Sequence, residues 1–220
     1  MLVLRGFSRP APRATALTIG NFDGVHRGHR ALLKRLRVVA ENEGLSPAVL
    51  TFEPHPREFF SPQTAPARLS VLREKLEMLA EEGVALCCVA RFTTSLSALS
   101  AEDFITEIIA GSLKAKYLIV GDDFRFGARR EGGFVTLRAA GERTGFHVER
   151  MESVTIDDER VSSSAARAAL AAGNLRRATR LLGYPYTIDG RVIHGDKLAR
   201  DLGFATANIH IRHDNPPLSG

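Results

Sequence analysis

The 220-residue sequence has no tryptophan, only two cysteines and no long apolar run. Cys87 and Cys88 are adjacent, and neighbouring residues of a strand point to opposite faces, so we expect two small core side chains rather than a disulfide. No stretch approaches the roughly 18 to 20 apolar residues that a membrane-spanning helix needs. Arg5 and Pro10 interrupt the N-terminal apolar patch where a signal peptide would need its core. These absences predict a cytoplasmic protein without a membrane segment.

Charge of one sign is not concentrated in any part of the chain. There are 30 Lys and Arg and 25 Asp and Glu residues, a formal net charge of +5 at pH 7, and no basic block stands out. This scatter favours a mixed solvated surface suited to small anionic ligands over a DNA- or RNA-binding stripe. With 44% hydrophobic residues the chain can bury a core. We expect a monomer or weak homo-oligomer with no nucleic-acid partner.

Short apolar runs alternate with amphipathic segments along the first 183 residues. The apolar runs predict strands at 16–20, 48–52, 85–90, 117–121 and 146–150. The amphipathic segments predict helices at 28–43, 70–82, 101–113, 134–144, 162–172 and 174–182. This alternation predicts an α/β fold whose parallel sheet is covered on both faces and binds ligands at the carboxyl ends of its strands.

After Gly183 the pattern changes. Two candidate strands, 186–194 and 205–211, are joined by a polar stretch without a helical period. The sequence therefore predicts a domain over residues 1–183 and the incomplete start of a β domain over residues 184–220. Fewer than about 40 residues rarely fold alone, so we expect this second piece to dock on the first or to belong to something longer.

The strongest chemical signal lies between the first predicted strand and the first predicted helix, in the run Gly20-Asn-Phe-Asp-Gly-Val-His-Arg-Gly-His29. A glycine turn brings backbone close to a ligand, and the N-terminus of a helix attracts an anion. Histidines three residues apart at that helix start can point to one spot, so we favour a phosphate site. The alternatives are a capped turn with two solvated histidines and a metal site, for which no third ligand is nearby.

Three further blocks follow predicted strands or open a helix: Thr51-Phe-Glu-Pro-His-Pro56, Val120-Gly-Asp-Asp-Phe-Arg-Phe-Gly127 and Arg160-Val-Ser-Ser-Ser-Ala-Ala-Arg167. The two prolines of the first block predict an extended loop whose Phe52 and His55 line a pocket or merely pack. The second block lies at the carboxyl end of a strand, as part of a site or as a structural turn. The serines of the third offer hydroxyls and free amides to phosphates, although helix capping also explains them.

Together the four blocks resemble the prokaryotic bifunctional riboflavin kinase/FMN adenylyltransferases, the FAD synthetase family, across the whole first domain. The form Gly-Asn-Phe-Asp-Gly-x-His-x-Gly-His is more specific than the bare His-x-Gly-His motif of the nucleotidylyltransferase superfamily. The resemblance implies a Rossmann-like domain that converts FMN and MgATP into FAD and pyrophosphate. Ser164 stands where the family more often has Thr, and Ala166 where it has a larger aliphatic residue.

The resemblance also implies site residues in three groups. The catalytic residues are His26 and His29, which hold the reactants in line and neutralise the α-phosphate. The residues that bind ATP and its phosphates are Gly20, Asn21, Phe22, Asp23, Gly24, Gly28, Arg160, Ser163, Ser164 and Arg167. The residues that bind the flavin are Phe52, His55, Asp123, Phe124 and Phe126. Mg²⁺ arrives with ATP, and we expect no dedicated protein cage for it.

Residues 190–195 and 202–208 resemble the start of the family's riboflavin kinase domain, a β-barrel. The resemblance assigns Thr206 and Asn208 to a Mg-ATP site, although Ala205 replaces the proline that is usual there. The complete family protein also phosphorylates riboflavin, but its acidic catalytic base belongs to a part of the barrel that these 220 residues lack. We therefore expect no riboflavin kinase activity from this chain alone.

Two other functions are alternatives to adenylyl transfer to FMN. One is a non-catalytic flavin- or nucleotide-binding module, which the intact His26, His29 and Arg167 argue against. The other is a different reaction of the superfamily, such as adenylylation of phosphopantetheine, which the blocks at 51–56 and 120–127 argue against.

Overall fold

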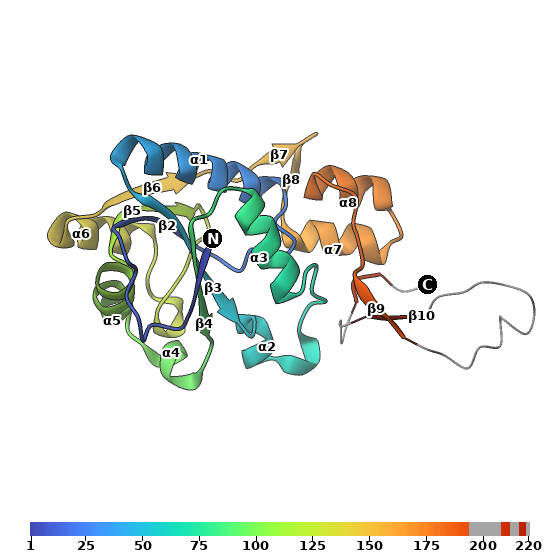
Figure 1. Cartoon of the computed structure of the whole chain (residues 1–220), viewed down its shortest axis with the longest axis horizontal. Helices are drawn as coiled ribbons and strands as arrows, with labels where there is room; N and C mark the ends of the chain where they lie inside the picture. The colour runs from blue at the N-terminus through green and yellow to red at the C-terminus, as the bar shows by residue number, and fades with distance from the viewer. Residues whose placement is uncertain (194–207, 212–215, 219–220) are drawn as a thin grey trace, which may run out of the picture.

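The computed structural model describes residues 1–193, 208–211 and 216–218. Its main sheet has six parallel strands in the order β1-β4-β3-β2-β5-β6 (Figure 1). Their bounds are β1 Leu2–Arg5, β2 Thr15–Ile19, β3 Ser46–Glu53, β4 Leu86–Arg91, β5 Ala115–Gly121 and β6 His147–Met151. The predicted α/β fold with a parallel sheet is confirmed.

Helices cover both faces of this sheet. One face packs against α1 (Arg27–Glu43) and α3 (Leu72–Glu81), and the other against α5 (Ala101–Asp103), its π-helical continuation η2 (Phe104–Ser112) and α6 (Phe134–Thr144). Cys87 belongs to the first of these two cores and Cys88 to the second, and both are free thiols. The two cysteines therefore point to opposite faces, as predicted.

Two parts of the sequence prediction need correction. No strand was predicted at Leu2–Arg5, yet β1 pairs with β4 at the edge of the sheet. The helix predicted at 101–113 becomes π-helical after its first turn, with the backbone nitrogen of Leu113 bonded to the carbonyl oxygen of Ile108, five residues earlier. Both segments still pack where the topology requires, so the architecture is unchanged.

The shorter helices and turns connect these layers. They are α2 (Pro56–Phe60), η1 (Pro62–Thr64), α4 (Thr94–Ala98) and η3 (Ala128–Arg130). Among the described residues, no helix is both long enough and apolar enough to cross a bilayer.

The part of the chain after β6 forms a third core. The hairpin β7 (Thr155–Ile156) and β8 (Glu159–Arg160) leads into α7 (Ser163–Ala171) and α8 (Leu175–Leu182), and these helices pack on Leu69, Tyr184 and Tyr186. Beyond them β9 (Gly190–Ile193) and β10 (Asn208–Ile211) form an antiparallel pair (Figure 1). Of the strand predicted at 186–194, residues 186–189 are not in a strand, whereas the described residues 208–211 of the strand predicted at 205–211 all belong to β10. Thr206 lies outside the described residues, and the predicted barrel and domain division stay predictions.

Candidate functional site

The glycine-rich run lies between the carboxyl end of β2 and the N-terminus of α1, as the sequence predicted. Phe22 and Val25 are buried and have positive φ angles of 48° and 30°. Gly24 has a φ of 75°, and a Cβ there would lie 2.9 Å from side-chain atoms of Leu69. Glycine is therefore required at position 24 both for its backbone conformation and for space. The result is a tight loop that delivers the next residues to the start of the helix.

The two histidines of the run converge. His26 is the N-cap of α1, and its Nδ1 atom accepts a hydrogen bond of 3.3 Å from the backbone nitrogen of His29. The two imidazole rings stack with centroids 3.6 Å apart, and Phe22 packs on His29 at 4.8 Å. The Nδ1 atom of His29 is buried and has no hydrogen-bond partner among the described residues. The predicted meeting of both rings at one point is confirmed.

Burial keeps both imidazoles neutral near pH 7. It lowers the pKa of His26 to about 4, with the Asp23 carboxylate opposing the shift. It also lowers the pKa of His29, and the nearby His26 and Lys75 add to the effect. At pH 7 each ring therefore offers one N–H donor rather than a positive charge.

Asp23 links the glycine loop to two distant segments. Its carboxylate accepts hydrogen bonds of 3.0 Å from the backbone nitrogens of Leu69 and Ser70 and pairs with Arg167 at 2.5 Å. The hydroxyl of Ser163 donates to the backbone carbonyl of Asp23 over 3.0 Å. The structure thus brings Ser163 and Arg167 of α7 to the loop. The hydrogen-bonding capacity of the Asp23 carboxylate is used by groups of the protein itself.

The three serines at the start of α7 lie in different surroundings. Ser162 is the N-cap and accepts from the backbone nitrogen of Ala165, while Ser164 is exposed. Gly28 lies beside this segment, since a Cβ on it would be 3.2 Å from the His26 ring and 3.7 Å from the carbonyl oxygen of Val161. Capping explains Ser162, and the hydrogen bond to Asp23 places Ser163 beside the glycine loop, whereas no contact of Ser164 with the loop is seen in the described residues.

The block at 51–56 is not the extended loop that its prolines predicted. Pro56 is the first residue of α2, a position where proline is favoured because its missing N–H is not needed there. His55 caps this helix: its Nδ1 atom accepts from the backbone nitrogen of Arg57, and its own backbone nitrogen donates to Glu58. Arg68 bridges Glu58 and Glu53 at 2.5 Å each, which ties α2 to the end of β3.

An aromatic cluster adjoins this block, and the sequence reasoning found only one of its members. Phe52 meets Phe92 edge to face at 5.8 Å, and Phe59 and Phe60 each contact Phe92 with centroids 5.3 and 5.6 Å apart. Phe60 is 65% exposed, which is unusual for so large an apolar side chain. The adjacent Phe59 and Phe60 directly after the 51–56 block were the available sequence signal.

The block at 120–127 lies at the carboxyl end of β5. Phe124 and Phe126 stack with centroids 5.6 Å apart, but Phe126 is buried against Phe104 in the core and only Phe124 is partly exposed. Asp123 pairs with Arg160 at 2.8 Å on the surface. Asp123, which the resemblance assigned to the flavin, therefore contacts Arg160, which it assigned to ATP.

The segment after Gly183 also reaches the glycine loop. The Tyr184 hydroxyl donates to the carbonyl oxygen of Gly24 over 2.6 Å, and the guanidinium of Arg30 lies 5.2 Å from the centre of the Tyr184 ring. Asn208, assigned to a second nucleotide site, lies at the start of β10 and is exposed. No contact joins it to the residues around His26 in the described structure.

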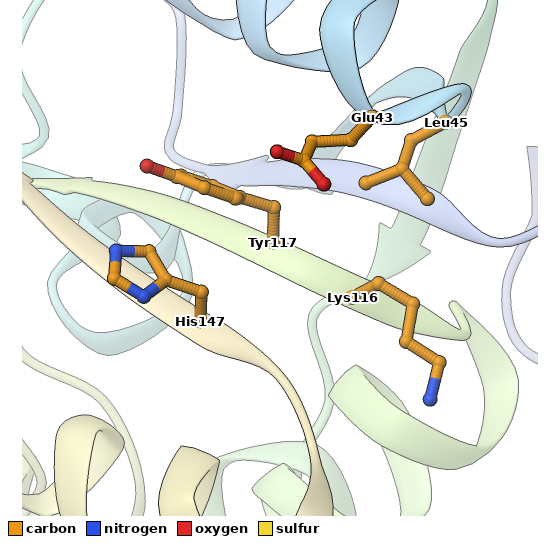
Figure 2. Close-up of a pocket in the computed structure, with 5 residues that line it drawn as sticks. All are labelled: Glu43, Leu45, Lys116, Tyr117 and His147. Atoms are coloured by element: carbon orange, nitrogen blue, oxygen red, sulfur yellow. The ribbon is translucent and has the colours of Figure 1, made fainter.

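A pocket lies at the opposite end of the strands, where β5 and β6 begin. It has a volume of about 520 Å³ and is lined by Glu43, Leu45, Lys116, Tyr117 and His147 (Figure 2). Figure 2 shows Lys116 pointing away from Glu43 and Tyr117. None of the predicted site residues lines this pocket. Elsewhere in the described ranges, no group of three or more His, Cys, Asp or Glu side chains is placed to hold a metal ion.

The parallel sheet, the glycine loop at the end of β2 and the stacked histidines at the start of α1 define a nucleotide-binding α/β domain of the His-x-Gly-His class. Residues 8–165 match the family model of FAD synthetase, and residues 182–220 match part of the family model of riboflavin kinase. The chain belongs to the FAD synthetase family.

Individual relatives agree with this assignment. The chain is 47% identical to the bifunctional riboflavin kinase/FMN adenylyltransferase of Escherichia coli strain K12, over all of this chain and 71% of the relative. It is 48% identical to the protein of the same name from Pseudomonas fluorescens, with the same coverage. A crystal structure described as a macrolide-efflux protein from Streptococcus pneumoniae superposes with a TM-score of 0.84 at 24% identity, over 99% of this chain and 71% of that one. This last likeness shows a shared fold.

Proposed function

We propose that this chain transfers the adenylyl group of MgATP to FMN and releases FAD and pyrophosphate. The observation that carries the proposal is the pair of stacked histidines at the N-terminus of α1, within the residues that match FAD synthetase. The names of the bacterial relatives give the same activity.

The chemistry needs positioning and charge stabilisation more than a base. A phosphate oxygen of FMN attacks the α-phosphorus of ATP, a new P–O bond forms, and the bond to the oxygen that bridges to the β-phosphorus breaks. The FMN phosphate is already an anion, so no proton has to be removed from the nucleophile. Mg²⁺ enters as part of the substrate and bridges the ATP phosphates.

His26 and His29 act as hydrogen-bond donors to the phosphates in this proposal. Their rings are neutral at pH 7, and the backbone amides at the start of α1 lie beside them. Donors fixed before the reaction stabilise charge that develops at the α-phosphate without reorganising. The phosphates lie, in this proposal, against the backbone of the loop residues Gly20, Asn21, Phe22 and Gly24 and against Gly28 in the first turn of α1. The residues Ser163, Ser164, Arg160 and Arg167 complete the ATP side.

Asp23 serves this site as a positioning residue. Its carboxylate is occupied by Leu69, Ser70 and Arg167, so it holds the loop and the Arg167 guanidinium rather than a nucleotide. This refines the sequence-based assignment, which placed Asp23 among the residues that bind ATP.

The flavin ring lies, in our proposal, against the aromatic side chains beside β3 and β5. The flavin can pack against the rings of Phe52, Phe60 and Phe92, which lie next to His55. The ring of the partly exposed Phe124 provides a further contact surface. Phe126 supports Phe124 from the core instead of touching the ligand.

The division of the chain is also a proposal. Residues 1–183 carry adenylyl transfer, and residues 184–220, with Thr206 and Asn208, belong to a riboflavin kinase unit. Tyr184 and Tyr186 pack on the first unit, so a boundary at 183 cuts through contacts that support the glycine loop.

A label-transfer experiment tests the reaction and its acceptor together. The purified chain is incubated with Mg²⁺, ATP labelled at its α-phosphate, and FMN and phosphopantetheine at equal concentration. We expect the label in FAD and in no other product. Label in the phosphopantetheine product would contradict the acceptor, and binding of FMN without any label transfer would favour the binding module.

A further inference from the structure

Lys75 is a buried basic residue that has no role in the reaction proposed above. It lies on α3 one helical turn before Leu79, and these two residues form the buried face of that helix. The Lys75 side chain is only 5% exposed, and no other lysine or arginine of the described residues is buried to this degree. Within the same residues its ammonium group makes no hydrogen bond or salt bridge, and its Nζ atom is not one of the fully buried unpartnered atoms, so the tip of the side chain keeps some accessible surface.

The position of α3 brings Lys75 to the nucleotide-binding edge of the sheet. α3 begins directly after Leu69 and Ser70, which the Asp23 carboxylate holds against the glycine loop. Buried polar residues gather at this edge: Thr18, Asp23, His26, Thr51, Ser70 and Lys75 are all there, and only Thr15 of the buried polar residues lies at the other end. Lys75 therefore belongs to a polar layer between the strand ends and the helices α1 and α3.

This layer contains buried atoms without partners. They are Oγ1 of Thr18, Oδ1 of Asn21, Nδ1 of His29 and Oε2 of Glu53, and they are the buried unpartnered side-chain atoms of the described structure. All four come from the ends of β2 and β3 or from the loop and helix that follow β2. Buried polar groups are normally paired, so unpaired groups collected at one place indicate a site for a polar ligand.

Two other cations near the loop, Arg167 and Arg68, already have acidic partners, while Arg27 is exposed. Arg167 pairs with Asp23, and Arg68 pairs with Glu53 and Glu58. The nearby imidazoles are neutral, because burial lowers the pKa of His26, His29 and His55. A charge on a mostly buried side chain without a bonded partner is unfavourable, and an anion that binds beside it lowers that cost.

Burial also lowers the pKa of Lys75, while Asp23 and Glu53 oppose the shift. The charge of Lys75 in turn contributes to the lowered pKa values of His29 and His55. These mutual effects are consistent with one charge cluster around the proposed phosphate position.

We propose that Lys75 binds a nucleotide phosphate in this site and neutralises its charge during adenylyl transfer. The proposal rests on the function proposed above and adds a charged contact that the neutral histidines do not supply. Phosphate oxygens of ATP and of FMN share the relevant chemistry, and separate measurements with each nucleotide distinguish them.

The test is the Lys75→Met variant of the full chain, with Lys34→Met on the exposed side of α1 as the matched control. Methionine keeps the length of the side chain and removes its charge. We expect Lys75→Met to unfold at the same temperature as the wild type or higher, because an unpaired buried charge is gone. We expect its rate of FAD formation to fall on the order of 10² to 10³-fold, while Lys34→Met keeps the wild-type rate.

Isothermal titration with ATP alone and with FMN alone then identifies the phosphate. Weaker binding of ATP by Lys75→Met assigns Lys75 to ATP, and weaker binding of FMN assigns it to the acceptor. Unchanged binding of both, with a rate within threefold of the wild type, overturns the proposal. So does loss of folding in both Lys75→Met and Lys75→Gln, which would show that the lysine has a structural role.

A failure of the adenylyl-transfer proposal can be distinguished from a failure of the Lys75 proposal. If the wild type forms no FAD, inorganic pyrophosphate replaces the substrates, and its effect on the melting temperature is compared between the wild type and Lys75→Met. Stabilisation of the wild type alone supports a phosphate contact at Lys75, and equal stabilisation of both proteins contradicts it.

Discussion

Replacing His29 by alanine separates catalysis from stability at this site. The variant loses one ring N–H donor at the proposed phosphate position. Loss of one fixed donor to developing charge lowers a rate on the order of 10² to 10³-fold, which corresponds to about 3 to 4 kcal/mol of transition-state stabilisation. We expect His29→Ala to form FAD more slowly by that factor at saturating MgATP and FMN.

The effect of His29→Ala on folding is much smaller. The stack of His29 on His26 at 3.6 Å and its contact with Phe22 at 4.8 Å are lost. Such ring pairs contribute about 0.5 to 1.5 kcal/mol each, but the buried Nδ1 atom without a partner disappears as well, which returns about 1 to 3 kcal/mol. These effects nearly cancel, so we expect the melting temperature to change by less than about 4 °C.

The assay is the initial rate of FAD formation followed by chromatography, beside thermal unfolding of the same preparations. His147→Ala is the matched control, because His147 is exposed at the opposite edge of the sheet. A His29→Ala rate within fivefold of the wild type would refute the reasoning. A large loss of stability with the wild-type rate per folded molecule would show that His29 is structural.

Three further predictions follow from named contacts. Asp23→Asn weakens the buried pair with Arg167, so we expect the free energy of unfolding in urea to fall by about 3 to 5 kcal/mol; a change below about 1 kcal/mol would contradict the role of Asp23 in holding the loop. His26 has a pKa of about 4 in the folded protein against an ordinary value of 6.5, so the unfolded chain binds more protons between these values. The contribution of neutral His26 to the free energy of unfolding is therefore complete above about pH 6.5 and is lost towards pH 4, by about 3 kcal/mol. If the free energy of unfolding in urea of a His26→Gln variant fell just as steeply with acid, this role of His26 would be refuted. Phe60→Ala removes the most exposed ring of the aromatic cluster, so we expect a KM for FMN about tenfold higher with the KM for ATP unchanged; an equal rise in both would show that the ring does not contact the flavin.

The central strands and helices followed from the sequence because their patterns were strong. β2, β3, β4 and β5 each contain a short run of mostly apolar residues, which is typical of buried parallel strands. β1 is a half-exposed edge strand of four residues ending in Arg5, and its short apolar patch carried too little pattern to predict a strand. The run at 101–113 has a helical period that does not distinguish an α-helix from a π-helix.

The site was only partly predictable for a different reason. The meeting of His26 and His29 follows from their spacing on one helix start, so local sequence was enough. The bond between Asp23 and Arg167 joins residues 144 positions apart, and no local pattern encodes such a contact. Pro56 was interpreted as extending a loop, although proline also starts helices. Lys75 was missed because a lysine in an amphipathic helix is usually solvated, and only its spacing from Leu79 placed it on the buried face.

The most direct test of the account is the stoichiometry of the wild-type reaction. The purified chain is incubated with Mg²⁺, ATP and FMN, and both FAD and pyrophosphate are quantified over time. The account predicts one pyrophosphate released for each FAD formed, and no FAD when riboflavin replaces FMN. Pyrophosphate without FAD, or neither product from protein that binds both nucleotides, would contradict it.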